Sequence, residues 1–273
     1  MLSKDTTLCI SIASRPSNFG ASLFNLLFGE LGMDWAYKPF KVGPESLAPA
    51  VAAIRALPIR GCGVSMPHKA AVMKYLDRVD PTAARIGAVN TIVNEGGKLT
   101  GYNTDYAGFA RAIGENYRLD GKAALVFGAG GAARAAITAA KGLGAKKIFV
   151  CSRNPAKARA LCRKFGCTAI PRSLVAKAGA RLFFNATPVG MFPYASRMPI
   201  TRDELASFEA VADAVNNPHE TALIRAARRM GKVAIAGCEM SFYQGLAQFA
   251  LYTGKNAPKK IERKALRALL PKR

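Results

Sequence analysis

A glycine-rich turn between an expected strand and an expected helix places the strongest constraint on the fold of this chain. The segment Gly128-Ala129-Gly130-Gly131-Ala132-Ala133 follows the apolar run 123–127 and fits the pattern G-x-G-x-x-G/A. The first glycine permits a tight turn, the second lets the backbone approach a pyrophosphate, and the small last residue allows close helix–sheet packing. The helix start offers unpaired N–H groups to phosphates. We therefore predict a dinucleotide-binding α/β unit whose phosphate contacts come from Gly128, Ala129, Gly130, Gly131 and Ala132.

The residues after the next expected strand indicate which dinucleotide is bound. This strand, 147–151, is followed by Ser152, Arg153 and Asn154, with Lys157 close behind. A site for NAD places Asp or Glu here to bind the ribose 2′-hydroxyl, whereas an arginine pairs with the 2′-phosphate of NADP. We predict NADP as the cofactor, held by these four residues.

Strand and helix patterns alternate along the whole chain, on both sides of a turn at 120–122. Before this turn we expect strands at 8–13, 35–42 and 61–66, helices at 21–31, 47–56, 70–76 and 106–116, and a hairpin at 89–102 that turns at Gly96-Gly97. After it we expect strands at 123–127, 147–151, 181–185, 210–214 and 233–236, a helix that ends at 141, and helices that start at 155 and 221. Such alternation favours two α/β units, the first with a largely parallel sheet.

The net charge of +23 determines which partners need to be considered. Lys and Arg number 40 against 17 Asp and Glu, so nucleic acid, membrane surfaces and phosphorylated ligands would all be attracted. The basic residues are spread along the chain, apart from a dense cluster at 255–273, and helix-turn-helix, RNA-binding and zinc-finger patterns are missing from the sequence. We interpret the charge as a compositional bias and expect no specific nucleic-acid partner.

Cysteine and histidine usage argues against a metal site. The cysteines form no CxxC pair, and the two histidines, His68 and His219, lie far apart. We expect free, mostly buried thiols, no metal, and a reducing cytoplasm as the location. We expect neither a signal peptide nor a membrane span, because the most apolar stretch, 123–140, contains glycines and Arg134.

Several motifs resemble one enzyme family, in the family's order and over nearly the whole chain. Val64-Ser65-Met66-Pro67-His68-Lys69 resembles the shikimate dehydrogenase motif of a hydroxyl residue, an apolar residue, Pro, a variable residue and Lys. Ala88-Val89-Asn90-Thr91 resembles the family's substrate-binding Asn motif, and Gly101-Tyr102-Asn103-Thr104-Asp105 its catalytic Asp motif. The segment 185–191 and the stretch 237–244 also resemble the family.

The resemblance implies an NADP-dependent oxidoreductase that interconverts shikimate, or a closely related cyclic hydroxy acid, and its 3-dehydro ketone, in the chorismate pathway of aromatic amino acid biosynthesis. Lys69 and Asp105 would be the catalytic pair, with Lys69 as general acid/base. Residues 1–105 would form the substrate-binding and catalytic domain, residues 106–240 the Rossmann NADP-binding domain, and helices in 241–273 would pack back on the first domain. The active site would lie in the cleft between the domains of a monomer or homodimer.

The resemblance also implies further ligand contacts. Asn90 and Gln244 would bind substrate hydroxyls, and Ser65 would replace a threonine that does the same. Met240 and the backbone near Gly237 would line the nicotinamide, and the cofactor site would also include Thr187 and Val215.

The chain departs from the family pattern where the substrate carboxylate is usually bound. The family's first loop carries two serines for this purpose, but here, counting back from Phe24-Asn25, their places fall on Asn18 and Gly20. Ser17 and Asn18 are therefore the substrate-binding candidates in this loop. Asn216 stands where the family usually has Tyr. These changes match the divergent shikimate dehydrogenase-like branch, and they leave two alternatives open: a quinate or aminoshikimate-type dehydrogenase, and a low-activity NADP-binding regulatory protein.

Overall fold

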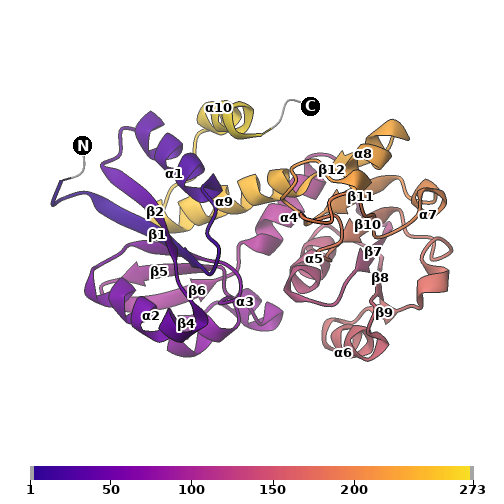
Figure 1. The fold of residues 1–273 in the computed structure, drawn as a ribbon, viewed down its shortest axis with the longest axis horizontal. Coiled ribbons are helices and arrows are strands. Elements are labelled where there is room, and N and C mark those ends of the chain that lie inside the picture. Colours follow the sequence, from indigo (N-terminus) through magenta and orange to yellow (C-terminus); the bar gives the residue numbers. More distant parts are fainter. Residues whose placement is uncertain (1–2, 271–273) are drawn as a thin grey trace. The chain divides into compact units, whose positions relative to one another are not determined.

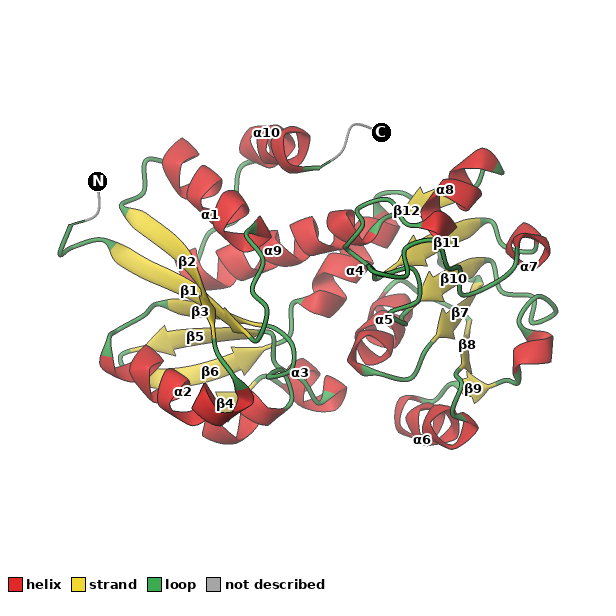
Figure 2. Cartoon of the chain, viewed as in Figure 1, coloured by secondary structure: helices red, strands yellow, loops and turns green. Residues whose placement is uncertain are grey.

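The computed structural model describes residues 3–270, which form two compact units. One unit comprises the chain up to Thr104 together with the segment from Gln244 onward, and the other comprises Asp105–Tyr243. Each unit is built on its own six-stranded sheet with helices around it (Figure 2). This architecture confirms the prediction of two α/β domains.

The first unit contains a mixed sheet in the order β2-β1-β3-β5-β6-β4. Strands β1, β2 and β3 are parallel, whereas β5 runs antiparallel to both β3 and β6. Strand β4 is parallel to β6, and because β5 is antiparallel to both β3 and β6, the other five strands share one direction. The expected largely parallel sheet is thus confirmed, with β5 as the exception that the hairpin at Gly96-Gly97 introduces. The strands of this unit are β1 (Thr7–Ala13), β2 (Trp35–Lys41), β3 (Gly61–Val64), β4 (Arg78–Val79), β5 (Thr91–Glu95) and β6 (Lys98–Tyr102).

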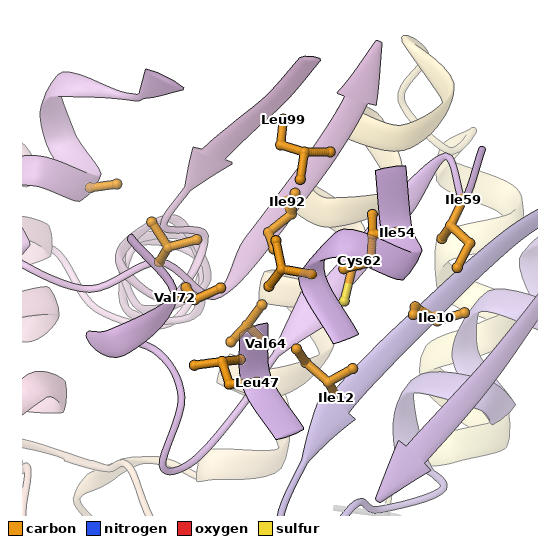
Figure 3. Close-up of a cluster of buried hydrophobic side chains, with 13 residues drawn as sticks. Ile10, Ile12, Leu47, Ile54, Ile59, Cys62, Val64, Val72, Ile92 and Leu99 are labelled. Atoms are coloured by element: carbon orange, nitrogen blue, oxygen red, sulfur yellow. The ribbon is translucent and has the colours of Figure 1, made fainter. Parts of the chain in front are cut away.

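Helices cover both faces of this sheet (Figure 1). They are α1 (Phe19–Glu30), η1 (Pro44–Ser46), α2 (Leu47–Ala56), η2 (Ala71–Tyr75), α3 (Pro81–Ile86), the second part of α9 (Gly237–Thr253) and α10 (Lys259–Leu269). Against one face, α2 and η2 pack their side chains on the strands, as in the pair Ile54 and Ile92 (Figure 3). Against the other face, Phe24 of α1 stacks on Tyr37 of β2 at 4.5 Å between ring centroids and contacts Tyr252 of α9. The C-terminal segment is therefore an integral layer of this unit.

Three details of this unit differ from the sequence-based expectation. Segment 70–76 contains a 3-10 helix, η2, in place of an α-helix, because its chain leaves Pro67 in a tight turn held by the His68 N–H bond to the Ser65 carbonyl. Helix α3 was not expected, although Asp80 caps it by accepting from the N–H groups of Thr82 and Ala83, with Pro81 at its first position. Helix α9 begins at Gly237, earlier than the expected start near 241.

The second unit is a doubly wound, all-parallel sheet in the order β12-β11-β10-β7-β8-β9. Read from β9 to β12 and numbered from β7 as the first strand, this order is 3-2-1-4-5-6, which is the order of dinucleotide-binding folds. The switch point lies between β7 and β10. The strands are β7 (Ala123–Phe127), β8 (Lys147–Cys151), β9 (Thr168–Ala169), β10 (Leu182–Asn185), β11 (Ala210–Asp213) and β12 (Val233–Ile235). The helices are α4 (Asp105–Gly114), α5 (Gly131–Gly142), α6 (Pro155–Phe165), η3 (Arg172–Leu174), α7 (Arg202–Ala206), α8 (Ala222–Arg229) and the first part of α9.

Candidate active site and cofactor site

The glycine turn lies at the switch point of the second sheet, between β7 and α5. Gly128 has a positive φ of 130°, and a Cβ there would lie 2.8 Å from the Ala186 carbonyl oxygen of the neighbouring loop. Only glycine fits such a position without strain. In contrast, a Cβ on Gly130 or Gly131 would meet no atom within 4 Å, so their backbone is open to a ligand. Together with the N-terminus of α5 at Gly131, this open backbone fits the pyrophosphate of a dinucleotide.

The end of β8 presents the residues expected at the adenine ribose. The Ser152 hydroxyl accepts from the Asn154 N–H at 3.3 Å, and the Asn154 side-chain oxygen accepts from the Lys157 N–H at 3.0 Å. Asn154 is thus the N-cap of α6, and it holds the loop in a fixed shape. The Arg153 and Lys157 side chains are exposed. Arg153 on this loop and Lys157 in the first turn of α6 are two cations that fit a 2′-phosphate.

A buried hydrogen-bond network supports the two loops expected at the nicotinamide end. The Asp213 carboxylate accepts from Asn185 Nδ2 at 2.9 Å, from the Val215 N–H at 3.0 Å and from the Thr221 hydroxyl at 2.6 Å. The oxygen Oδ1 of Asn185 in turn accepts from the Thr187 hydroxyl at 2.7 Å. Burial raises the pKa of Asp213 to about 6. The network fixes Thr187 and Val215, both of which the family resemblance assigns to the cofactor site.

The start of α9 lies against the same loop. A Cβ on Gly237 would lie 2.2 Å from the Val215 carbonyl oxygen, so any other residue would push helix and loop apart. Met240, one turn further along the helix, is only 1% exposed. Val215 and Gly237 therefore lie against each other, and the Met240 side chain is buried beside them in the chain, while their roles at the nicotinamide stay a prediction.

In the first unit, backbone hydrogen bonds bring the expected catalytic motifs together. The Lys69 carbonyl accepts from the Val89 N–H at 2.7 Å, and the Asn90 N–H donates to the Tyr102 carbonyl at 3.0 Å. The Asn90 side-chain oxygen accepts from the Thr104 N–H at 2.7 Å. Asp105 follows Thr104 directly along the chain and is the first residue of α4 and of the second unit. The Lys motif, the Asn motif and the Asp motif thus converge although 36 residues separate the first from the last in sequence.

His68, the titratable residue next to the expected base Lys69, is buried. Its side chain is 1% exposed, and its Nε2 lies 2.9 Å from the Val42 carbonyl oxygen. Lys69, by contrast, is half-buried, as expected when neighbouring side chains diverge at a turn. Of these two neighbouring side chains, Lys69 is therefore the more accessible to solvent.

The remaining expected substrate residues occupy different environments. Ser65, at the end of β3, and Ser17 and Asn18, in the loop after β1, are exposed. Asn18 precedes α1, and its carbonyl, not its side chain, accepts the helix bond from Ser22 at 2.9 Å. Gln244 is half-buried on α9.

Sequence reasoning missed several polar residues that support the site from behind. In the first unit these are Thr91, Thr104 and Gln248, and in the second they are Asn185, Asp213 and Thr221, all of them buried. Thr91, Thr104 and Asn185 lie within the motifs that resemble the family, but the motifs give them no supporting role and no partner, and the other three carry only the signal of a polar residue in an apolar segment. Their hydrogen bonds connect segments far apart in the chain, and only the fold reveals them.

Within residues 3–270, no helix is long and apolar enough to cross a bilayer. The same part of the chain contains no group of three or more His, Cys, Asp or Glu side chains that could hold a metal ion. Its six cysteines are free, and five of them are buried.

The parallel sheet with its glycine turn defines a dinucleotide-binding unit, and in the same chain hydrogen bonds join the lysine, asparagine and aspartate motifs. The class is therefore that of the nicotinamide-dependent dehydrogenases built from two α/β units. Residues 19–92 match the family model described as the shikimate dehydrogenase substrate binding domain. The chain belongs to the shikimate dehydrogenase family, as its relatives over nearly the full length also show.

Two curated relatives and one solved structure illustrate the similarity. The NADP(+) shikimate dehydrogenase of Moorella thermoacetica is 39% identical over 277 residues, which cover 97% of this chain and 94% of that protein. The shikimate dehydrogenase-like protein of Haemophilus influenzae is 38% identical over 93% of each chain. The crystal structure of Thermus thermophilus shikimate 5-dehydrogenase in complex with NADP(H) and shikimate has a TM-score of 0.88 and 32% identity, covering 97% of this chain and 100% of that one.

Proposed function

We propose that this protein is an NADP-dependent oxidoreductase that interconverts shikimate, or a closely related cyclic hydroxy acid, and its 3-dehydro ketone. The observation that carries the proposal is the combination of a complete cofactor unit with the converging Lys69, Asn90 and Asp105 motifs in one chain. The family relatives named NADP(+) shikimate dehydrogenase, and the homologous structure containing NADP(H) and shikimate, support the same substrate and cofactor.

The proposed chemistry divides between the two units. Bound NADP supplies the acceptor for the hydride that leaves the carbinol carbon. Lys69 takes the proton from the hydroxyl that is oxidised, and returns it in the reverse direction. Asp105 orients Lys69 and the same hydroxyl, while Asn90, Ser65 and Gln244 hold the other hydroxyls of the ring. The open backbone at Gly130 and Gly131 and the cations Arg153 and Lys157 bind the phosphates.

The residues for the substrate carboxylate separate this protein from ordinary members of the family. Neither Asn18 nor Gly20 is the serine expected there, and Asn216 replaces a tyrosine. Ser17 and Asn18 are exposed and polar, so we assign the carboxylate to them and expect weaker binding than the family's paired serines would give. A quinate or aminoshikimate-type substrate is the second candidate, because the carboxylate contacts and Ser65, in place of a threonine, differ from the family pattern.

The assay that tests the function measures reduction of NADP+ and NAD+ with shikimate, quinate and an aminated shikimate analogue, with NADP+ binding measured separately by calorimetry. We expect NADP+ reduction with at least one substrate and a clear preference for NADP+ over NAD+. Tight NADP+ binding without turnover of any substrate would instead identify a low-activity regulatory protein. Equal efficiency with both cofactors would overturn the role given to Arg153.

We further propose a cytoplasmic enzyme that works as a monomer or homodimer on a small molecule, without a specific nucleic-acid partner. The free, buried thiols agree with a reducing compartment. Sedimentation would give the oligomeric state. Binding to random DNA that vanishes as salt is raised and shows no sequence preference would mark the charge of +23 as incidental to function.

A further inference from the structure

Gln248 lies on α9, one helical turn after Gln244, and its side chain is buried (6% exposed). Its Nε2 donates to the Asn90 carbonyl at 3.0 Å and to the Thr91 hydroxyl at 2.9 Å. Both acceptors lie at the beginning of β5, 157 and 158 residues earlier in the chain. A primary amide inside an apolar helix face is costly unless paired, so these two bonds fix the position of the helix on the sheet.

The sheet provides a place for this amide. Gly63 of β3 is paired with Thr91 of β5, and a Cβ on Gly63 would lie 2.8 Å from the Tyr37 hydroxyl and 3.5 Å from Gln248 Nε2. Because Gly63 has no side chain, the Tyr37 hydroxyl can lie over this strand, while Gln248 Nε2 is at ordinary contact distance beside it.

The bond from Gln248 sets the direction of the hydrogen bonds beyond it. The Thr91 hydroxyl oxygen accepts from the Gln248 amide and donates its own proton to Asn90 Oδ1, 2.8 Å away, and it also lies 3.2 Å from the Thr104 hydroxyl oxygen. That oxygen also accepts from the Thr104 N–H, while Asn90 Nδ2 donates to the Thr104 hydroxyl at 3.1 Å. The side-chain amide of Asn90 is therefore held in one of its two orientations.

We propose that Gln248 is a positioning residue. It acts through Thr91 to orient Asn90 toward the substrate, and through Asn90 it helps to hold Thr104, the residue that precedes Asp105. This inference rests on the proposed function only for the role of Asn90 and Asp105. The same helix presents Gln244, so α9 would contribute one glutamine that binds substrate and one that sets the groups around it. Without Gln248, the Thr91 hydroxyl loses a donor and can rotate away from Asn90 Oδ1, so that the Asn90 side chain is held by its bonds to Thr104 and is less firmly fixed.

The test compares Gln248→Leu with Arg60→Met. Arg60 is a matched control, because its side chain also joins α9 to β5, through the carbonyls of Tyr252 and Asn94, but at a distance from Asn90 along the strand. If Gln248 served only to hold α9 on the sheet, Gln248→Leu and Arg60→Met would lower kcat/KM equally when their losses of thermal stability are equal. We expect Gln248→Leu to lower kcat/KM for shikimate by about 10- to 30-fold, the equivalent of two neutral hydrogen bonds, with an unchanged KM for NADP+. Arg60→Met should leave kcat/KM within about threefold.

A double-mutant cycle with Thr91→Val tests the route of the effect. If Gln248 acts through Thr91, the double variant should lose little more than Gln248→Leu alone. Fully additive losses would overturn the proposal, as would equal losses in Gln248→Leu and Arg60→Met.

A second measurement is independent of turnover. Hydrogen exchange of the Thr104 amide, which donates to Asn90 Oδ1, should become faster in Gln248→Leu and stay unchanged in Arg60→Met. If the unmodified protein oxidises no substrate, the proposed function fails, but this exchange still tests the network. Unchanged exchange at Thr104 in Gln248→Leu would overturn the positioning role.

Discussion

Replacing Asp213 by Asn should make the stability of this protein less dependent on pH, because this carboxyl is buried in the second unit. Asp213 is 0% exposed and ends β11, where it accepts the three hydrogen bonds from Asn185, Val215 and Thr221. Burial, which these bonds offset only in part, raises the pKa of Asp213 from 3.8 to about 6. The folded protein consequently holds this proton more tightly than the unfolded chain does.

The sign and size of the effect follow from this shift. Since the folded pKa is raised, the contribution to stability is present below the unfolded pKa and is lost as the pH rises from about 4 through about 6. Two pKa units correspond to about 3 kcal/mol in the free energy of unfolding. An asparagine copies the protonated acid, with Oδ1 accepting from Asn185 and Val215 and Nδ2 donating to Thr221. We therefore expect the stability of Asp213→Asn relative to the unmodified protein to increase by about 2–3 kcal/mol between about pH 4 and pH 7.

Urea unfolding at both pH values, followed by far-UV circular dichroism, measures this difference. Trp35 is the single tryptophan and lies in the first unit, so its fluorescence follows the unit that Asp213 does not belong to. The control is Asp77→Asn, because the hydrogen bonds from the Leu99 N–H and Arg55 lower the pKa of Asp77. Its contribution has the opposite sign, being lost as the pH falls. A stability difference for Asp213→Asn that is the same at both pH values would refute the reasoning.

Three further predictions concern catalysis and specificity. Lys69→Ala should lower kcat by about 10²–10⁴-fold with a much smaller effect on KM, and Asp105→Asn should also impair kcat while both variants keep their affinity for NADP+. His68→Ala should be comparatively mild in turnover once unfolded material is excluded, and a dead His68 variant beside a normal Lys69 variant would reassign the base. Arg153→Asp should narrow or reverse the preference for NADP+, read from kcat/KM with the two cofactors. The kcat/KM for shikimate should be lower than in ordinary family members, by the equivalent of about 1.5–3 kcal/mol of transition-state binding for each missing carboxylate contact. Asn216→Tyr should recover part of this loss, and a kcat/KM at the usual family level in the unmodified protein would contradict the prediction.

Most secondary structure could be predicted from the sequence, because its signals are local. The apolar run 123–127, the glycines after it and the small residues of α5 specify a strand, a turn and a helix without reference to other parts of the chain. The same holds for the hairpin at Gly96-Gly97, where both glycines have positive φ. The short elements β4, β9, α3 and α7 escaped prediction, because two to six residues carry too little periodicity.

The sequence by itself also determined the family, the cofactor class and the expected catalytic residues, since motifs with fixed spacing carry them. Only the tertiary structure decided which side chains support those residues. That His68 is bound to the Val42 carbonyl while Lys69 remains half-buried depends on the path of β2 beside β1, which brings a residue 26 positions away to the ring. That Gln248 reaches Asn90 depends on α9 crossing the sheet of the first unit. Hydrogen bonds between distant segments leave no local pattern, because each partner taken alone is an ordinary polar residue, and their pairing exists only once the chain has folded.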